Sequence, residues 1–260
     1  MQKEAFSYRG IVGQAQARSR IVRKKEQVEK DNIIVELILA FCCLIIGRTT
    51  ILGQVSPFGI SLYAVMLQRK RARLSAFIAI AAGMLSIGIE GVTFKYIGAM
   101  IAVLIMLKAV ENIKGYYGIF TAALSASGAL IISNLVYGSL RPGGMLIYDY
   151  ILMGLEGTLG FVMVYVFQHV MAVVLEKTRR RILSNEEMIS ISIFVALLIS
   201  GLWDIKIFGF STRNILSILF VLIFSYIGGP GIGASMGIMV GLVLSLSSKQ
   251  EPMLLAIFGV

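Results

Sequence analysis

Charged residues are scarce in this sequence, and they gather in short clusters between long apolar stretches. Only 15% of the 260 residues are Asp, Glu, Lys or Arg, whereas 57% are hydrophobic and the mean hydropathy is +0.86. A soluble domain carries about a quarter of charged residues, which it needs to cover its surface. The composition therefore excludes an ordinary water-soluble globule and predicts an all-α, polytopic helical membrane protein.

Histidine and cysteine are almost absent, which limits the chemistry that the chain can perform. His169 is the only histidine, so a His-cluster metal site is excluded and a His-based catalytic triad is disfavoured. We expect His169 to be an interfacial residue near the inner end of a helix. Cys42 and Cys43 are adjacent within an apolar stretch, where neither a disulfide nor a metal-ligand spacing is available, and we expect them to pack. The sequence predicts no catalytic, cofactor-binding or metal-binding residue.

The N-terminal segment lacks the apolar core that a cleavable signal peptide needs. Residues 1–32 carry eight of the 24 Lys and Arg residues. We interpret residues 1–32 as a basic cytoplasmic arm and residues 33–260 as a multi-pass transmembrane domain. The excess of basic residues favours anionic lipid headgroups over nucleic acid as a partner, because a nucleic-acid site needs a basic face on a soluble fold.

The apolar stretches predict eight complete membrane spans and a ninth after Pro230. They cover residues 33–52, 57–68, 74–89, 96–110, 116–137, 146–175, 188–201, 215–227 and 232–246. Residues 253–260 begin one more apolar stretch that is too short to cross a bilayer, and we expect it to be a truncated last helix.

The positions of Lys and Arg predict how these spans are oriented. With the N-terminus inside, 18 of the 24 basic residues fall in cytoplasmic segments, including the clusters at 69–73 and 177–181. We therefore expect a protein of the inner (plasma) membrane with a cytoplasmic N-terminus.

Glycines recur at every fourth position near the end of the chain. Gly229, Gly233, Gly237 and Gly241 share one helix face that is almost bare backbone. In lipid, small residues at this spacing allow a neighbouring helix to approach closely. Two interpretations remain open, namely packing within the same molecule and self-association.

Two carboxylates mark the sixth apolar stretch. Asp149 and Glu156 are seven residues apart, so they project from one side of that helix. Glu156 lies deep enough that it must be protonated, paired or in a wet cavity. It is either a structural, hydrogen-bonded carboxyl or a contact for a ligand or ion.

Two local signals mark the seventh span. Ser184 and Glu187 have the spacing of a capping box that opens a helix. Trp203 follows the span, where an amphipathic ring anchors a helix at the outer headgroup level.

Several short motifs, taken in their order along the chain, carry a resemblance to a known family. They are Gly47-Arg48 with Ile51-Leu52, Val55-Ser56-Pro57-Phe58, Tyr148-Asp149-Tyr150 followed by Glu156, Glu186-Glu187, and Phe224-Ser225-Tyr226-Ile227-Gly228-Gly229 leading into Ile232-Gly233. Together with Gly13-Gln14-Ala15 in the basic arm, they resemble the N-terminal membrane region of the stage II sporulation protein E family from endospore-forming bacteria. The resemblance covers nearly the whole chain.

The resemblance implies a role as a membrane anchor. Proteins similar to this one continue into a cytoplasmic region that associates with the tubulin-like division protein, and then into a PP2C-type phosphatase domain that uses manganese. That domain dephosphorylates an anti-anti-sigma factor and so activates the forespore sigma factor. This chain is expected to hold such a phosphatase at the asymmetric septum and to self-associate. The phosphatase motifs are missing here, so Mn or Mg is expected only in the absent domain.

Two other classes of function are alternatives to the anchor. A small-solute or ion transporter would use Glu156 and Asp149, but the sequence shows only one Gly/Pro-interrupted stretch, near Pro230. A membrane-embedded enzyme would need a constellation of His, Cys or acidic residues that the sequence does not offer.

Overall fold

The structure is a computed structural model, and it describes most of the chain after the N-terminal arm. The described residues are 33–51, 55–70, 73–88, 91–115, 118–141, 144–175, 184–202, 206–207 and 210–247. The chain divides into two compact units, residues 1–41 and 42–260, and the fold described below is that of the second. The N-terminal arm, Trp203 and residues 253–260 lie outside the described residues, as do the predictions made for them.

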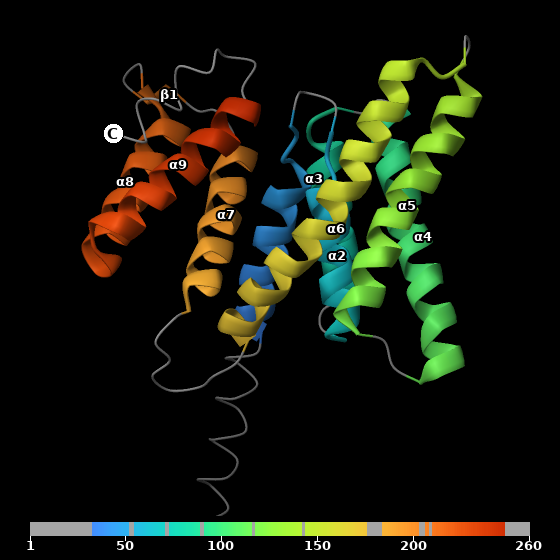
Figure 1. Cartoon of the computed structure of the whole chain (residues 1–260), viewed down its shortest axis with the longest axis horizontal. Coiled ribbons are helices and arrows are strands. Elements are labelled where there is room, and N and C mark those ends of the chain that lie inside the picture. Colours follow the sequence, from blue (N-terminus) through green and yellow to red (C-terminus); the bar gives the residue numbers. More distant parts are fainter. Residues whose placement is uncertain are drawn as a thin grey trace, which may run out of the picture. The chain divides into compact units, whose positions relative to one another are not determined.

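In the described part of the chain, a helix lies at each of the nine predicted apolar stretches (Figure 1). The first helix is Ile33–Gly47, and those that follow are α2 (Phe58–Gln68), α3 (Arg73–Leu85), α4 (Gly91–Lys114), α5 (Ile119–Leu140), α6 (Ile147–Leu175), α7 (Asn185–Gly201), α8 (Thr212–Gly228) and α9 (Pro230–Ser247). The prediction of a polytopic all-α membrane fold is confirmed.

Four of these helices are long and apolar enough to cross a membrane by themselves. They are α4 through its segment Thr93–Ile113, together with α5, α6 and α9. The first helix, α2, α3 and α8 are apolar but shorter. Most of the side chains in each long window are not buried inside the chain, as expected for helices that face lipid.

Helix α2 lies at the centre of the first group of helices. Every residue from Phe58 to Leu67 is buried, and α2 packs against α3, α4, α5 and α6. The hydroxyl of Ser61 donates a hydrogen bond to the carbonyl oxygen of Gly160 in α6, at 2.9 Å. A helix that is apolar on all sides is typical of one enclosed by protein. Its 11 residues rise about 16 Å, roughly half of the hydrocarbon thickness.

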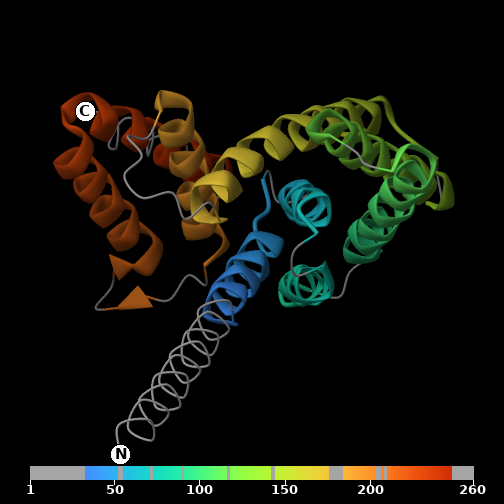
Figure 2. The same ribbon diagram turned by 90° about the horizontal axis from the view of Figure 1, so that it is seen from below.

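The second group of helices is built around α9. Both views show α7, α8 and α9 together, and α9 packs along α7 and α8 (Figures 1 and 2). Helix α6 contacts α7 and so joins the two groups. A short antiparallel hairpin, β1 (Lys206–Ile207) and β2 (Phe210–Ser211), connects α7 to α8 and was not predicted from the sequence. At the turn from α8 to α9, Gly229 has a φ of +85°, a conformation that glycine adopts without strain.

Three glycines far apart in the sequence allow close helix crossings in this unit. A Cβ atom added at Gly47 would lie 2.5 Å from the carbonyl oxygen of Ile80 in α3. A Cβ at Gly83 would overlap the carbonyl oxygen of Leu44, and one at Gly201 would overlap that of Ile45. The last turns of the first helix therefore meet α3 and α7 backbone to backbone.

Candidate functional site: a buried polar cluster below a cavity

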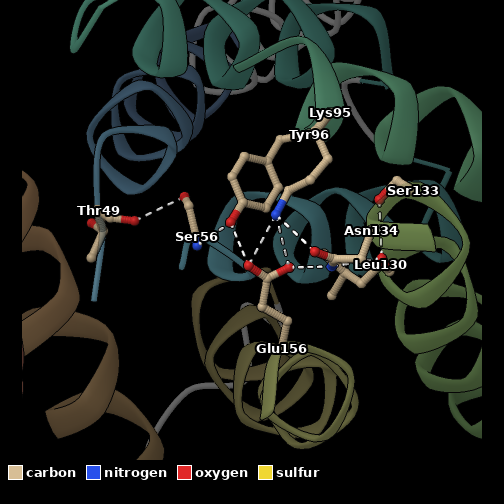
Figure 3. Close-up of polar contacts among 8 residues, drawn as sticks. All are labelled: Thr49, Ser56, Lys95, Tyr96, Leu130, Ser133, Asn134 and Glu156. Carbon is tan, nitrogen blue, oxygen red and sulfur yellow. Dashed lines mark hydrogen bonds and ion pairs between the residues drawn. The ribbon is translucent and has the colours of Figure 1, made fainter. Parts of the chain in front are cut away.

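Three polar side chains from α4 and α5 meet around Glu156 of α6 (Figure 3). Lys95 and Tyr96 come from the first turns of α4, Asn134 from α5, and Glu156 from the third turn of α6. The side chains of Lys95 and Glu156 are only 6% and 3% exposed. The Nζ atom of Lys95 lies 3.1 and 3.3 Å from the two carboxylate oxygens of Glu156. The intramembrane carboxylate thus has a buried cation as its partner.

The remaining hydrogen bonds close this cluster on itself. The Tyr96 hydroxyl donates to Oε1 of Glu156 at 2.7 Å, and Nδ2 of Asn134 donates to Oε2 at 2.5 Å. Lys95 also donates to Oδ1 of Asn134 at 3.0 Å, and its Nζ lies 4.3 Å from the centre of the Tyr96 ring. The three ammonium protons can therefore all be matched by acceptors within the cluster.

Backbone groups extend the cluster toward the segment before α2. The amide of Ser56 donates to the Tyr96 hydroxyl at 2.9 Å, and the Ser56 hydroxyl donates to the carbonyl of Thr49 at 2.9 Å. The Thr49 hydroxyl in turn donates to the carbonyl of Leu197 in α7 at 3.1 Å. On the α5 side, Nδ2 of Asn134 also donates to Leu130. The polar contacts therefore connect α4, α5 and α6 with the α2 entry segment and α7.

A cavity of about 460 Å³ lies against the cluster. Among the described residues, its charged lining is Lys95, Arg141, Asp149 and Glu156. Its uncharged polar lining includes Thr50, Ser56, Thr93, Tyr96, Asn134 and Tyr137. Its apolar walls include Met84, Ile87, Met145 and Leu152. The structure therefore brings Asp149 and Glu156 to the same cavity, whereas the sequence predicted only that they project from one side of the helix.

The energetics of the cluster favour a structural role for Glu156. Taking two charges out of water costs several kcal/mol per ion by general estimates, and this cost is offset only when the ions are paired and their other hydrogen bonds are made. The Lys95 ammonium, the Tyr96 hydroxyl and the Asn134 amide meet that condition. Of the two interpretations of Glu156, the hydrogen-bonded structural carboxyl agrees with this geometry. Among the described residues, no group of three His, Cys, Asp or Glu side chains could hold a metal ion.

The sequence reasoning missed three members of the cluster. The predicted fourth span begins at Tyr96, which leaves Lys95 in the loop before it. Asn134 was read as part of an apolar stretch. An amide in the last turns of an otherwise apolar span is a signal that could have drawn attention to it, since such a group needs a partner in lipid.

The glycine series near the end of the chain lies mostly within the molecule. Gly233, Gly237 and Gly241 are buried in α9, and Gly229 forms the turn before it. A Cβ atom at Gly233 would overlap the side chain of Ser225 in α8. This agrees with packing inside one chain, whereas self-association stays a prediction.

Other predicted local features are also found. The Ser184 hydroxyl accepts from the amide of Glu187, and the Glu187 carboxylate accepts from the amide of Ser184, so the capping box is confirmed. His169 is partly exposed, with Nδ1 2.9 Å from the carbonyl oxygen of Tyr165 and Nε2 4.0 Å from Glu186. Cys42 and Cys43 are free, and Cys43 is fully buried.

Comparison with known families places these features in context. A family model described as "SpoIIE, N-terminal domain" matches residues 2–260. The chain belongs to this family. This chain is 27% identical over 212 residues to stage II sporulation protein E of Bacillus subtilis (strain 168). No solved structure matches the chain.

The match to the Bacillus subtilis protein covers different shares of the two chains. The match includes 78% of this chain but only 24% of that relative. The chain thus spans about a quarter of the length of the curated relative that it matches. With its apolar helices, the family assignment identifies a sporulation-related, membrane-associated domain.

Proposed function

We propose that this domain is the membrane anchor and localisation domain of a stage II sporulation protein E-like phosphatase at the asymmetric division septum. The observation that carries the proposal is the family match over residues 2–260, in a chain that holds four helices able to cross a membrane. By resemblance, the whole protein would dephosphorylate an anti-anti-sigma factor and activate the forespore sigma factor. Catalysis would belong to a region outside this sequence.

The polar cluster suits a domain that holds its shape rather than one that moves ions. An ion carrier needs a carboxylate that can exchange its partner during each cycle. In Glu156 both oxygens are occupied by donors from the same chain, and one of those donors is a tethered cation. This geometry supports the anchor over the transporter.

Contacts at the opposite end of the helices support the proposed orientation. Lys70, after α2, forms an ion pair with Glu111 near the end of α4 at 2.6 Å. Arg69 donates to the side chain of Gln168 near the end of α6 at 3.3 Å. These contacts join the ends of α2, α4 and α6 that the distribution of basic residues assigns to the cytoplasm.

The partners of the domain follow from the same proposal. The bilayer surrounds the exposed apolar side chains of the long helices. We also propose self-association of the domain, and an association of the cytoplasmic region outside this sequence with the tubulin-like division protein. Neither partnership needs a cofactor in this chain.

A chimera tests the proposal directly. The corresponding N-terminal region of the Bacillus subtilis relative would be replaced by residues 1–260, with a fluorescent protein at the C-terminus. A matched control chimera would carry an unrelated polytopic membrane domain of similar length. We expect the first chimera to gather at the asymmetric septum and to support spore formation, and the control to spread evenly over the membrane.

Two outcomes would overturn the proposal. The first is an even distribution of both chimeras at equal abundance, which would show that the domain supplies attachment without localisation. The second is septal enrichment of the control, which would show that the rest of the protein is sufficient for placement.

A further inference from the structure

Among the described residues that line the cavity, two are cations and two are anions, but only one ion pair joins them. Lys95 and Glu156 form the buried ion pair at its floor. Arg141 and Asp149 also line the cavity, and with the residues that the structure describes they form no ion pair. Within the described part of the chain, one cation and one anion of this cavity thus have no charged partner.

Both of these side chains are held at the edge of the cavity by their helices. Arg141 ends α5, where its amide donates to Gly138, and its side chain is exposed. Asp149 is in the first turn of α6, where Oδ2 accepts from the amide of Leu146 at 2.9 Å. The described contacts leave Oδ1 of Asp149 and the Arg141 guanidinium able to contact a ligand.

We propose that this cavity binds a small zwitterion, a molecule that carries an ammonium group and an anionic group a few atoms apart. The anionic group would face Arg141, because a guanidinium donates two parallel hydrogen bonds to a carboxylate or phosphate. The ammonium group would face Asp149. A ligand with only one charge would meet only one of these two protein charges.

The rest of the lining fits this class of ligand. The apolar side chains of Met84, Met145 and Leu152 can contact the carbon atoms that join the two charged groups. The cavity volume of about 460 Å³ lies in the range of small-molecule sites. The buried cluster is the floor of this site. Because its donors are already used, it shapes the cavity while Arg141 and Asp149 supply the recognition.

Two sources could supply this chemistry, namely a free amino acid and the headgroup of a zwitterionic phospholipid. The first arm of the test measures binding to the purified domain in detergent by calorimetric titration. The probes are L-alanine, its anionic analogue N-acetyl-L-alanine and its cationic analogue L-alaninamide. The second arm compares thermal unfolding in nanodiscs of phosphatidylethanolamine with nanodiscs of phosphatidylglycerol.

The proposal expects the zwitterion to be preferred in at least one arm. Preference for L-alanine over both analogues identifies a free amino acid as the source. Stabilisation by phosphatidylethanolamine alone identifies the headgroup. Equal behaviour of all probes in both arms, or a preference for a singly charged probe, would overturn the proposal.

Four variants test the residues that are assigned to recognition. Arg141→Gln and Asp149→Asn should each weaken zwitterion binding by about tenfold or more, because each removes one charge-assisted contact. Lys108→Gln and Glu186→Gln are matched controls, since their exposed side chains do not line the cavity. Unchanged binding in both cavity variants, with the unfolding midpoint of the protein preserved, would also overturn the proposal.

Discussion

Glu156 shows how far single residues can be interpreted from the sequence. Its depth in an apolar stretch required that it be protonated, paired or hydrated. The structure pairs it with Lys95, which lies 61 positions earlier in the chain. No periodicity connects these two residues, because their contact depends on how α4 and α5 pack beside α6. The carboxylate was therefore predictable as a site that needs a partner, while the identity of the partner was not.

Loss of the Lys95 ammonium should destabilise the domain strongly. Lys95→Met leaves Glu156 buried without its cation, and we expect a loss of about 3–5 kcal/mol in the free energy of unfolding. The double variant Lys95→Met/Glu156→Gln should lose clearly less than the sum of the two single variants, because neither charge is then left alone. Chemical unfolding in detergent measures all three values.

The control for this set of single and double variants is Lys108→Met, which changes an exposed lysine of α4, the helix that carries Lys95. It should alter the free energy of unfolding by about 0.5 kcal/mol or less. If the losses at Lys95 and Glu156 were simply additive, the two side chains would not be coupled and the ion pair would not stabilise the fold.

Removal of the Tyr96 hydroxyl would affect its hydrogen bonds with Ser56 and Glu156. Tyr96→Phe leaves the amide of Ser56 without its acceptor and removes one donor from Glu156. We expect a loss of about 1–3 kcal/mol in the free energy of unfolding, as for other buried groups that lose a partner. Tyr150→Phe, at an exposed position of α6, is the matched control. Equal unfolding midpoints of the two variants would contradict this prediction.

At the scale of the helices, the sequence was most informative where apolar runs were continuous. Each of the nine predicted stretches contains a helix, because length and hydropathy decide whether a segment can be buried in lipid. The ends were less accurate for physical reasons. Helix α4 begins at Gly91 instead of 96, because Lys95 and Tyr96 point into the cluster and belong to the helix. The first helix ends at Gly47, since Ile51 and Val55 pair their backbone groups in the next turn.

The glycine crossings can be tested at the same scale. Gly83→Ala would place a Cβ against the backbone carbonyl of Leu44, which has no rotamer by which to move away. We expect a loss of about 1–3 kcal/mol in the free energy of unfolding from this overlap. At Gly98 in α4, a Cβ would meet nothing within 4 Å, so Gly98→Ala should be neutral or stabilising by up to about 1 kcal/mol.

The two glycine variants together separate packing from helix propensity. Both replace a helical glycine by alanine, so propensity alone predicts the same gain in each. A stabilising effect of Gly83→Ala would mean that the first helix and α3 do not cross as closely as described.

At the scale of the whole domain, the order of helices was predictable and their neighbours were not. Helix α2 was predicted as an ordinary span, yet it is the enclosed centre around which α3, α4, α5 and α6 pack. The glycine series was identified as a contact face, but its contacts with α7 and α8 depend on the turn at Gly229. Hydropathy predicts how apolar the surroundings of each helix are on average. Which helices pack together depends on the shapes of their surfaces and on a few polar pairs.

The orientation of the domain gives the last prediction. Lys70 lies at the end of the helices that carries the ion pair with Glu111, whereas Arg141 lies at the end of α5 beside the cavity. Basic residues concentrate on the cytoplasmic side, so we expect Lys70 inside and Arg141 outside. Lys70→Cys and Arg141→Cys would be made in a chain whose Cys42 and Cys43 are replaced by alanine.

Labelling by a membrane-impermeant maleimide then reports the side of each cysteine. In intact protoplasts only the Arg141→Cys protein should be labelled, and the Lys70→Cys protein should react only after permeabilisation. Both side chains are exposed, so a lack of reaction at Lys70→Cys in protoplasts would reflect the membrane barrier, and the permeabilised sample checks this. Labelling of the Lys70→Cys protein in protoplasts would reverse the orientation. The cavity would then open to the cytoplasm, and the proposed anchoring of a cytoplasmic phosphatase by this domain would be wrong.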